Sequence, residues 1–458
     1  MTEKRGGGSD ALATLTRGSV ARTLLGLSAP MVIGLFSVMA FNLTDTYFVS
    51  QLGTRELAAM TFTFPVVSVL YGLSMGMGTG TVSIIARAIG RGETSNVRRV
   101  CSDSLMLSFI IVLVVATAGV LTIDPLFRAL GATDEILPLI HEYMVIWYPG
   151  VVFLVVPMVA NAAIRASGDT RMPALIMTGA MTLNVLLDPI MIFGLFGFPR
   201  MELAGAAWAT VVARACTMIA SLAILHFRLR LLDFSPPGMG DILHSWRQLI
   251  SIAIPASLTN IMPSFATGFV TRLIAVYGAS AVAAWGAGSR ISYFVLIPVF
   301  AMCSGLVPFI GQNWGAEEFG RVRTARGYSY RIALAWGLVT AVLLHVGARS
   351  LAMLFSDSED VVDRIVTYLW VIPIGSGMVG ALLVAEETLN AIGKPIAASA
   401  QTAIHTFALY GPLAFLGSHV GGLVGLLAGI AAADILGGSV SMQIVRRLCG
   451  RRERTRGE

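Results

Sequence analysis

Charged residues are scarce in this sequence. Only 13% of its 458 residues are Asp, Glu, Lys or Arg, while 55% are hydrophobic. A soluble domain of ordinary composition is about 25% charged. The composition therefore excludes a soluble globular protein and indicates a chain that lies in lipid over most of its length.

Cysteine and clustered histidine are scarce as well. The four cysteines, Cys101, Cys216, Cys303 and Cys449, form no CxxC pair and stand far apart. This spacing argues against a disulfide framework and against a zinc site. We also find no nucleophile–base set, no histidines at metal-ligand spacing and no phosphate-binding loop. We therefore expect neither an enzyme nor a resident cofactor.

Long apolar runs dominate what is present. A membrane-spanning helix needs about 20 mostly apolar residues, and twelve segments meet this need. They are 24–48, 57–85, 100–122, 136–160, 172–196, 203–226, 247–275, 280–310, 328–349, 360–384, 393–417 and 419–445. The predicted fold class is an all-α integral membrane protein of twelve transmembrane helices.

Basic residues are unevenly shared between the loops. The loops after even-numbered spans and both tails hold most of them, including Arg98, Arg165, Arg321 and Arg446. The positive-inside rule then places both termini in the cytoplasm. An even number of spans agrees with this, because it requires both termini to lie on the same side. We assign the net charge of +6 to this bias rather than to nucleic-acid binding. The N-terminus lacks a cleavable signal pattern, and we expect an interfacial helix near Leu12–Arg22.

The second half of the chain repeats the first at a shift of 225 residues. This shift places Pro30 on Pro255, Gly53 on Gly278, Gly90 on Gly315 and Gly168 on Gly393. Because each half has six spans, both halves insert with the same orientation, related by a pseudo-two-fold axis along the membrane normal. Paired halves of this kind are typical of secondary transporters that work by alternating access. The predicted division is a tail over 1–23, an N-lobe over 24–226, a linker over 227–246, a C-lobe over 247–445 and a basic tail over 446–458.

An aspartate lies late in the first span, within the stretch FNLTDTYFVSQLG. A charge within hydrocarbon costs several kcal/mol, so Asp45 is a functional candidate by default. In span 5, Asn184 and Asp188 are four residues apart and share one helix face. Pro189 removes a backbone donor next to Asp188, which predicts a kink or loosened turn and a hinge. The repeat places Val270 opposite Asp45 and, with a slip of two residues, Gly411 opposite Asp188, so this acidic pair belongs to the N-terminal half alone.

Two carboxylates in one dry pocket are costly to keep ionised together. Either one of them holds a proton or a cation binds between them. Asp, Asn, Tyr and Thr oxygens suit a hard cation, and Tyr143 and Thr210 are further oxygen donors at plausible heights. The sequence therefore predicts a coupling site for transported H⁺, or for Na⁺ at Asp45, Asn184 and Asp188. Simpler interpretations stay open: Asp45 as a residue of the headgroup region, Asp188 as a local cap, and Asn184 as packing between helices.

Polar residues in the C-terminal half have less definite roles. Gln401 and His405 in span 11 either line a cavity or are packing residues, and Arg290 either contacts substrate or has a structural role. We interpret Arg214 in span 6 and Arg272 in span 7 as structural. Glu386 and Glu387 are expected to be solvated.

The sequence resembles the multidrug and toxic compound extrusion (MATE) transporter family. The resemblance lies in ARAIGRGE after span 2, IRASGDTRMP after span 4, LNVLLDPIMIFG in span 5, LAGAAWATVVA in span 6 and LNAIGKP after span 10. It implies export of amphiphilic, often cationic drug-like compounds in exchange for H⁺ or Na⁺, by a monomer in the plasma (inner) membrane.

The resemblance also carries residue roles. It implies a cation site at Asp45, Tyr143, Asn184, Asp188 and Thr210, and bending of span 1 at Pro30. Span 7 lacks an acidic residue, which favours the DinF-like branch and argues against a cation site in the C-lobe. A flippase for lipid-linked precursors, from the same superfamily, is the alternative function, and a channel is less favoured because the halves repeat.

Overall fold

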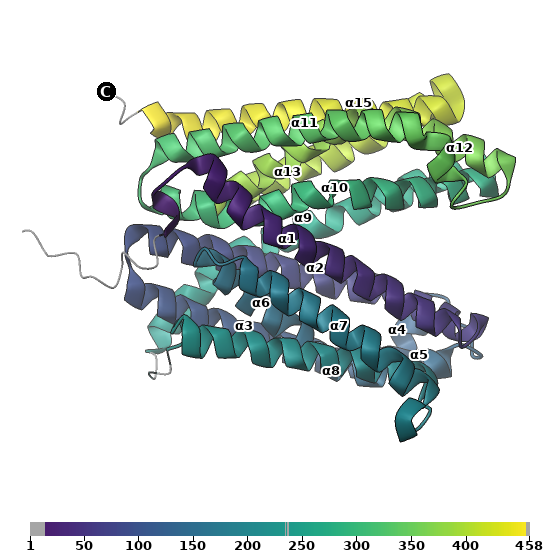
Figure 1. The fold of residues 1–458 in the computed structure, drawn as a ribbon, viewed down its shortest axis with the longest axis horizontal. Helices are drawn as coiled ribbons and strands as arrows, with labels where there is room; N and C mark the ends of the chain where they lie inside the picture. The colour runs from purple at the N-terminus through teal and green to yellow at the C-terminus, as the bar shows by residue number, and fades with distance from the viewer. Residues whose placement is uncertain (1–13, 234, 236–237, 455–458) are drawn as a thin grey trace, which may run out of the picture. The chain divides into compact units, whose positions relative to one another are not determined.

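The computed structural model describes residues 14–233, 235 and 238–454. These residues form helices joined by short turns, and no strand occurs among them. The all-α prediction is thus confirmed (Figure 1). The predicted tails 1–23 and 446–458 extend in part outside the described residues.

The first compact unit covers Ala29–Ser257. Apolar helix faces pack against one another in it, with α2 against α6 and α7 against α8. Its helices are α1 (Val20–Ser50), α2 (Thr54–Arg91), α3 (Thr94–Leu121), α4 (Ile123–Ala129), α5 (Leu137–Gly150), α6 (Val152–Ala166), α7 (Arg171–Phe193), α8 (Glu202–Ala223) and the first half of α9 (Met239–Ala275). Short turns of 3-10 or π geometry lie at Leu195–Gly197 and Ile224–Arg228.

The second unit joins Leu15–Ser28 to the chain from Leu258 onward. In it, α13 packs against both α11 and α15. Its further elements are α10 (Ala279–Gly315), α11 (Phe319–Ala352), α12 (Glu359–Val371), η4 (Ile372–Gly375), α13 (Ser376–Ala391), α14 (Pro395–Ala403), η5 (Ile404–Tyr410) and α15 (Gly411–Arg454). The sequence does not indicate that the start of α1 belongs to this unit. The predicted lobe boundaries stay a prediction.

The number of spans depends on a reversal within α15. Eleven helical stretches in the described chain are long and apolar enough to span a membrane, the last of them Pro395–Gly450. The backbone leaves helical geometry at Gly421 and Gly422, where φ of Gly422 is +61°. A β-carbon on Gly417 would lie 2.1 Å from the carbonyl oxygen of Gly425, so the two legs on either side of the reversal touch backbone to backbone. This stretch therefore contains two antiparallel spans, in agreement with the predicted twelve.

The internal repeat is visible in how the helices are interrupted. Span 4 is divided into α5 and α6 at Val151, just after Pro149. Span 10 is divided at η4, which contains Pro373, and α13 begins at Ser376, the residue that the 225-residue shift places on Val151. A proline ring cannot continue the hydrogen-bonding ladder of the preceding turn. Both units therefore carry an interrupted helix at the same position.

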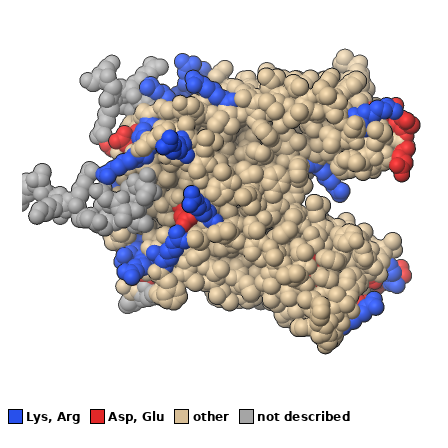
Figure 2. Space-filling model, in the orientation of Figure 1, with Lys and Arg blue, Asp and Glu red and all other residues tan. Residues whose placement is uncertain are grey.

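Charged side chains are confined largely to the ends of the helices. Figure 2 shows Lys and Arg gathered over the left end of each unit and a middle zone that is mostly free of charge. This distribution is the one expected for helices whose central parts lie in lipid.

The segment before α1 forms a 3-10 turn, Thr14–Thr16, and α1 already begins at Val20. Arg321 of α11 donates hydrogen bonds to the carbonyl oxygens of Leu15 at 3.1 Å and of Gly18 at 2.7 Å. Asn313 of α10 donates a further bond to the Leu15 carbonyl at 3.1 Å. The interfacial helix predicted near Leu12–Arg22 is thus wrong for its described part, because side-chain donors of the second unit hold this backbone in a turn. Leu12 lies outside the described residues.

Candidate functional site

Asp45 is a buried residue of α1. The helix continues to Ser50, and only 7% of the Asp45 surface is exposed. A residue of the headgroup region would present its carboxylate to solvent, so this burial argues against that interpretation. The position of Asp45 thus requires a neutralising partner.

Asn184 and Asp188 face each other along α7. The Asn184 side-chain amide donates a hydrogen bond to Oδ1 of Asp188 at 3.1 Å, and both residues are 0% exposed. The α-helix runs on through Pro189 to Phe193, without the loosened turn that the sequence predicts next to Asp188. The hinge roles of Pro30 and Pro189, both inside helices, stay predictions.

The first unit brings Asp45 and Asp188 together. Their charges act on each other, and the buried Tyr143 of α5 lies within electrostatic range of both. Helices α1, α5 and α7 therefore converge on one polar centre. Arg214 is included because its charge acts on Asp45 and Tyr143. We call Asp45, Tyr143, Asn184, Asp188 and Arg214 the N-terminal cluster.

Arg214 of α8, which the sequence led us to interpret as structural, also belongs to this centre. Its charge acts on Asp45 and on Tyr143, and its guanidinium carbon lies 5.5 Å from the centre of the Phe41 ring. A cation over an aromatic face is stabilised by the ring quadrupole. The signal available in the sequence was its spacing, since Arg214 follows Thr210 by one helical turn.

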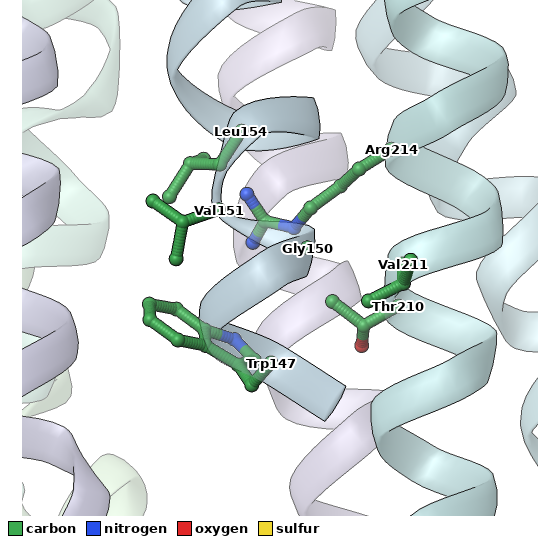
Figure 3. Close-up of a pocket in the computed structure, with 7 residues that line it drawn as sticks. All are labelled: Trp147, Gly150, Val151, Leu154, Thr210, Val211 and Arg214. Carbon is green, nitrogen blue, oxygen red and sulfur yellow. The ribbon is translucent and has the colours of Figure 1, made fainter. Parts of the chain in front are cut away.

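Thr210 lies in a narrow pocket beside Arg214. Trp147, Gly150 and Val151 line the opposite wall, and the empty space, including the open side, is about 180 Å³. Figure 3 shows Arg214 reaching from its helix toward Gly150, with Trp147 and the Thr210 hydroxyl below the guanidinium in this view. The side chains leave no room within it even for a water molecule, so a drug-sized ligand cannot bind there in this conformation.

Several buried oxygens of this region lack a hydrogen-bond partner among the described residues. They are Oδ1 of Asp45, Oδ1 of Asn184, Oδ2 of Asp188 and the Thr210 hydroxyl. Most buried polar atoms in proteins are satisfied, and leaving one unsatisfied costs about 1–3 kcal/mol. These oxygens are therefore available to a proton or a cation, the ligands that the sequence predicts.

The polar residues that the sequence analysis singled out in the C-terminal half have different environments and form no single cluster among the described residues. Gln401 donates a hydrogen bond to the Leu382 carbonyl at 3.1 Å and is buried, whereas Arg290 is exposed. His405 bonds to Asp434 at 3.0 Å. The sequence analysis overlooked Asp434, a buried acid of the C-terminal half. Glu386, expected to be solvated, is instead half-buried and accepts a hydrogen bond from Thr402 at 3.1 Å.

The family model described as MatE matches residues 30–190 and 255–416. A FAD transporter of Shewanella oneidensis is 37% identical over 94% of this chain and 95% of its own length. The multidrug export protein MepA of Staphylococcus aureus is 25% identical over 93% of each chain. The crystal structure of the Vibrio cholerae MATE transporter VcmN in its bent form has a TM-score of 0.91 and 30% identity, covering 97% of this chain and 99% of its own.

Proposed function

The chain belongs to the MATE family of multi-pass membrane transporters, and we propose that it exports amphiphilic compounds by antiport with a proton bound at the N-terminal cluster. The observation that carries this proposal is the burial of two interacting carboxylates, Asp45 and Asp188, with an unsatisfied oxygen on each. One carboxylate must be neutralised for the cluster to be stable in a low-dielectric setting.

Charge counting favours one exchangeable proton. Two ionised aspartates and the Arg214 guanidinium sum to a single negative charge, which one proton cancels. Na⁺ would need several oxygens from the cluster and would lie near the positive charge that already acts on Asp45. A proton needs only one oxygen. The coupling ion of our proposal is therefore H⁺, and Na⁺ is the alternative that the experiment below separates.

The driving force is sufficient for concentrative export. One charge moving through 100 mV gives about 2.3 kcal/mol, and each pH unit adds about 1.4 kcal/mol. In the proposed cycle, a proton enters the cluster from outside and the cargo leaves to the outside. The two lobes then change conformation, so that the site opens to the other side of the membrane. The small pocket beside Arg214 implies that cargo binds only when the first unit opens.

FAD is a second candidate cargo. It is favoured by the FAD transporter that is 37% identical to this chain and by the half-buried Arg214 beside the aromatic side chains of Phe41 and Trp147. A guanidinium pairs with phosphate oxygens, and aromatic side chains stack on flat heterocycles. A cationic drug gains nothing from Arg214, whereas an anionic dinucleotide does.

Proteoliposomes holding the purified protein test these proposals. They would be loaded with FAD or with a cationic dye, and inward H⁺ and Na⁺ gradients would be imposed separately. We expect the H⁺ gradient to drive efflux and Asp45→Asn to abolish it. Efflux driven only by the Na⁺ gradient would show that the coupling ion is Na⁺ and not H⁺. No efflux with either ion, together with passage of a labelled lipid-linked sugar, would favour the flippase.

We further propose a monomer in the plasma (inner) membrane with both termini in the cytoplasm, and a place in the DinF-like branch. The bias of Arg and Lys toward one set of loops supports the orientation. A C-terminal fusion to a reporter that fluoresces only in the cytoplasm should be bright. Activity of a C-terminal alkaline phosphatase fusion would place the C-terminus outside the cytoplasm and contradict the proposed topology.

A further inference from the structure

A histidine and an aspartate form a buried pair in the second unit. Nε2 of His405 in η5 lies 3.0 Å from Oδ1 of Asp434 in α15. Their side chains are 15% and 8% exposed. This pair is separate from the N-terminal cluster, which lies wholly in the first unit.

The backbone around the pair is shaped to admit these side chains. A β-carbon on Gly437 would lie 2.3 Å from Cδ2 of the His405 ring, and one on Gly375 would lie 2.9 Å from Cβ of Asp434. Any larger residue at either position would displace the pair. His405 also lies in a π-helical turn, Ile404–Tyr410, a geometry that is rare in proteins and frequent at functional sites.

The titratable groups around the pair are two tyrosines. The Tyr410 ring of η5 lies 5.8 Å from the His405 ring, and the Asp434 charge reaches both Tyr410 and Tyr368 of α12. The Tyr368 hydroxyl lies 3.2 Å from the Ser292 hydroxyl of α10. Toward this part of α15, η4 and α13 present Gly375 and Met378, which do not titrate.

The chemistry of the pair allows one exchangeable proton. Neutral histidine with ionised aspartate carries one negative charge, and an added proton makes the pair neutral overall. A buried net charge is unfavourable, while histidine is the side chain whose charge ordinarily changes between pH 5 and 8. The pair is therefore suited to take up and release a proton.

The internal repeat relates this pair to the N-terminal cluster. The 225-residue shift places Tyr143 on Tyr368, so each unit has a buried tyrosine at the same position beside a buried carboxylate. Asp434 stands one residue from the position that the shift assigns to Thr210. The C-terminal half thus has its own version of the polar centre, with different residues.

We propose that His405 and Asp434 form a second proton-binding site, which is loaded and emptied once in each export cycle. This inference rests on the proposed ion-driven export. It departs from the expectation that the C-lobe has no cation site, which was drawn from the absence of an acid in span 7.

Nuclear magnetic resonance of the full chain in nanodiscs, with ¹⁵N-labelled histidine, tests proton binding without transport. His405→Gln identifies the His405 signal, and His419→Gln, at an exposed position of α15, is the matched control. We expect the His405 signal to change with pH and this dependence to be altered in Asp434→Asn. A signal that stays constant over the whole pH range in which the protein remains folded would overturn the proposal.

Proton counting in proteoliposomes tests the coupling. We expect His405→Gln and Asp434→Asn to lower the number of protons taken up per exported molecule by one, and His419→Gln to leave it unchanged. An unchanged ratio in both variants would overturn the coupling even if His405 titrates. If wild-type export ignores every ion gradient, the proposed function fails with the coupling, while the resonance experiment still decides whether the pair binds a proton.

Discussion

The Asn184 amide donates its hydrogen bond to Asp188 Oδ1 across one turn of α7, at 3.1 Å, with both residues fully buried. This bond fixes the orientation of the Asp188 carboxylate and leaves its second oxygen without a partner among the described residues. The cluster thus holds one oxygen in place by a neutral donor and exposes the other to the coupling ion.

Asn184→Ala removes this donor, and we expect ion-driven export to fall about tenfold or more. A tenfold change corresponds to about 1.4 kcal/mol, a typical worth for a hydrogen bond to a charged group. The measurement is the initial rate of efflux under an inward H⁺ gradient. Asn42→Ala, at an exposed position of α1, is the control, and equal rates in both variants would contradict the role of Asn184.

Arg214→Gln should destabilise the protein, because it leaves two interacting carboxylates without the half-buried cation whose charge acts on Asp45. A destabilising substitution typically costs about 0.5–3 kcal/mol, and we expect a loss in this range. We expect a lower melting temperature in detergent and a partial recovery in the double variant Arg214→Gln/Asp45→Asn, in which one negative charge is also absent. Additive losses in the double variant would show that Arg214 and Asp45 do not interact.

Arg321→Ala should release the segment before α1 from the second unit, because Arg321 donates to the carbonyls of Leu15 and Gly18. Trypsin cleavage after the exposed Arg17 should then be about tenfold faster or more, since each bond to a charged donor contributes about 1.5–3 kcal/mol. The neighbouring exposed Arg323→Ala is the matched control. Equal cleavage rates in the two variants would contradict the role of the Arg321 hydrogen bonds in holding this segment.

Gly429→Ala should disturb the antiparallel contact within α15. A β-carbon there would lie 2.1 Å from the carbonyl oxygen of Leu413, so the two legs must move apart. Overpacking of this kind costs about 1–3 kcal/mol, and we expect a lower melting temperature. Gly286→Ala in α10, where no atom lies within 4 Å of the new carbon, should be neutral or slightly stabilising. A destabilised Gly286→Ala with an unaffected Gly429→Ala would contradict the described packing.

The sequence predicted the helices well because their signal is local. An apolar run long enough to span lipid is visible without any knowledge of its neighbours. The predicted boundary between the last two spans, 393–417 and 419–445, falls close to the reversal at Gly421 and Gly422. Asp45, Asn184 and Asp188 were predictable because charged and amide groups are rare in such runs. The approach of Asp45 to Asn184 and Asp188 follows from the contact of α1 with α7, where the Ser37 hydroxyl lies 3.0 Å from the Thr178 hydroxyl.

Other features depend on contacts that no spacing reveals. Arg214 has the appearance of a structural arginine until α8 places it against Phe41. His405 and Asp434 are 29 residues apart and meet only because α15 folds back on itself. The hydrogen bond from Arg321 to the Leu15 carbonyl joins residues 306 positions apart in the chain. Each of these depends on tertiary packing, which overrides local pattern.

The central claim is that Asp45 and Asp188 exchange a proton for cargo, and direct measurement of proton movement tests it most simply. Proteoliposomes would contain a trapped pH dye and a loaded cargo, with no Na⁺ present. The account predicts that cargo efflux acidifies the interior in wild type and that Asp45→Asn shows neither efflux nor acidification. Cargo efflux by the Asp45→Asn variant at the wild-type rate, or efflux with no accompanying proton entry, would contradict it.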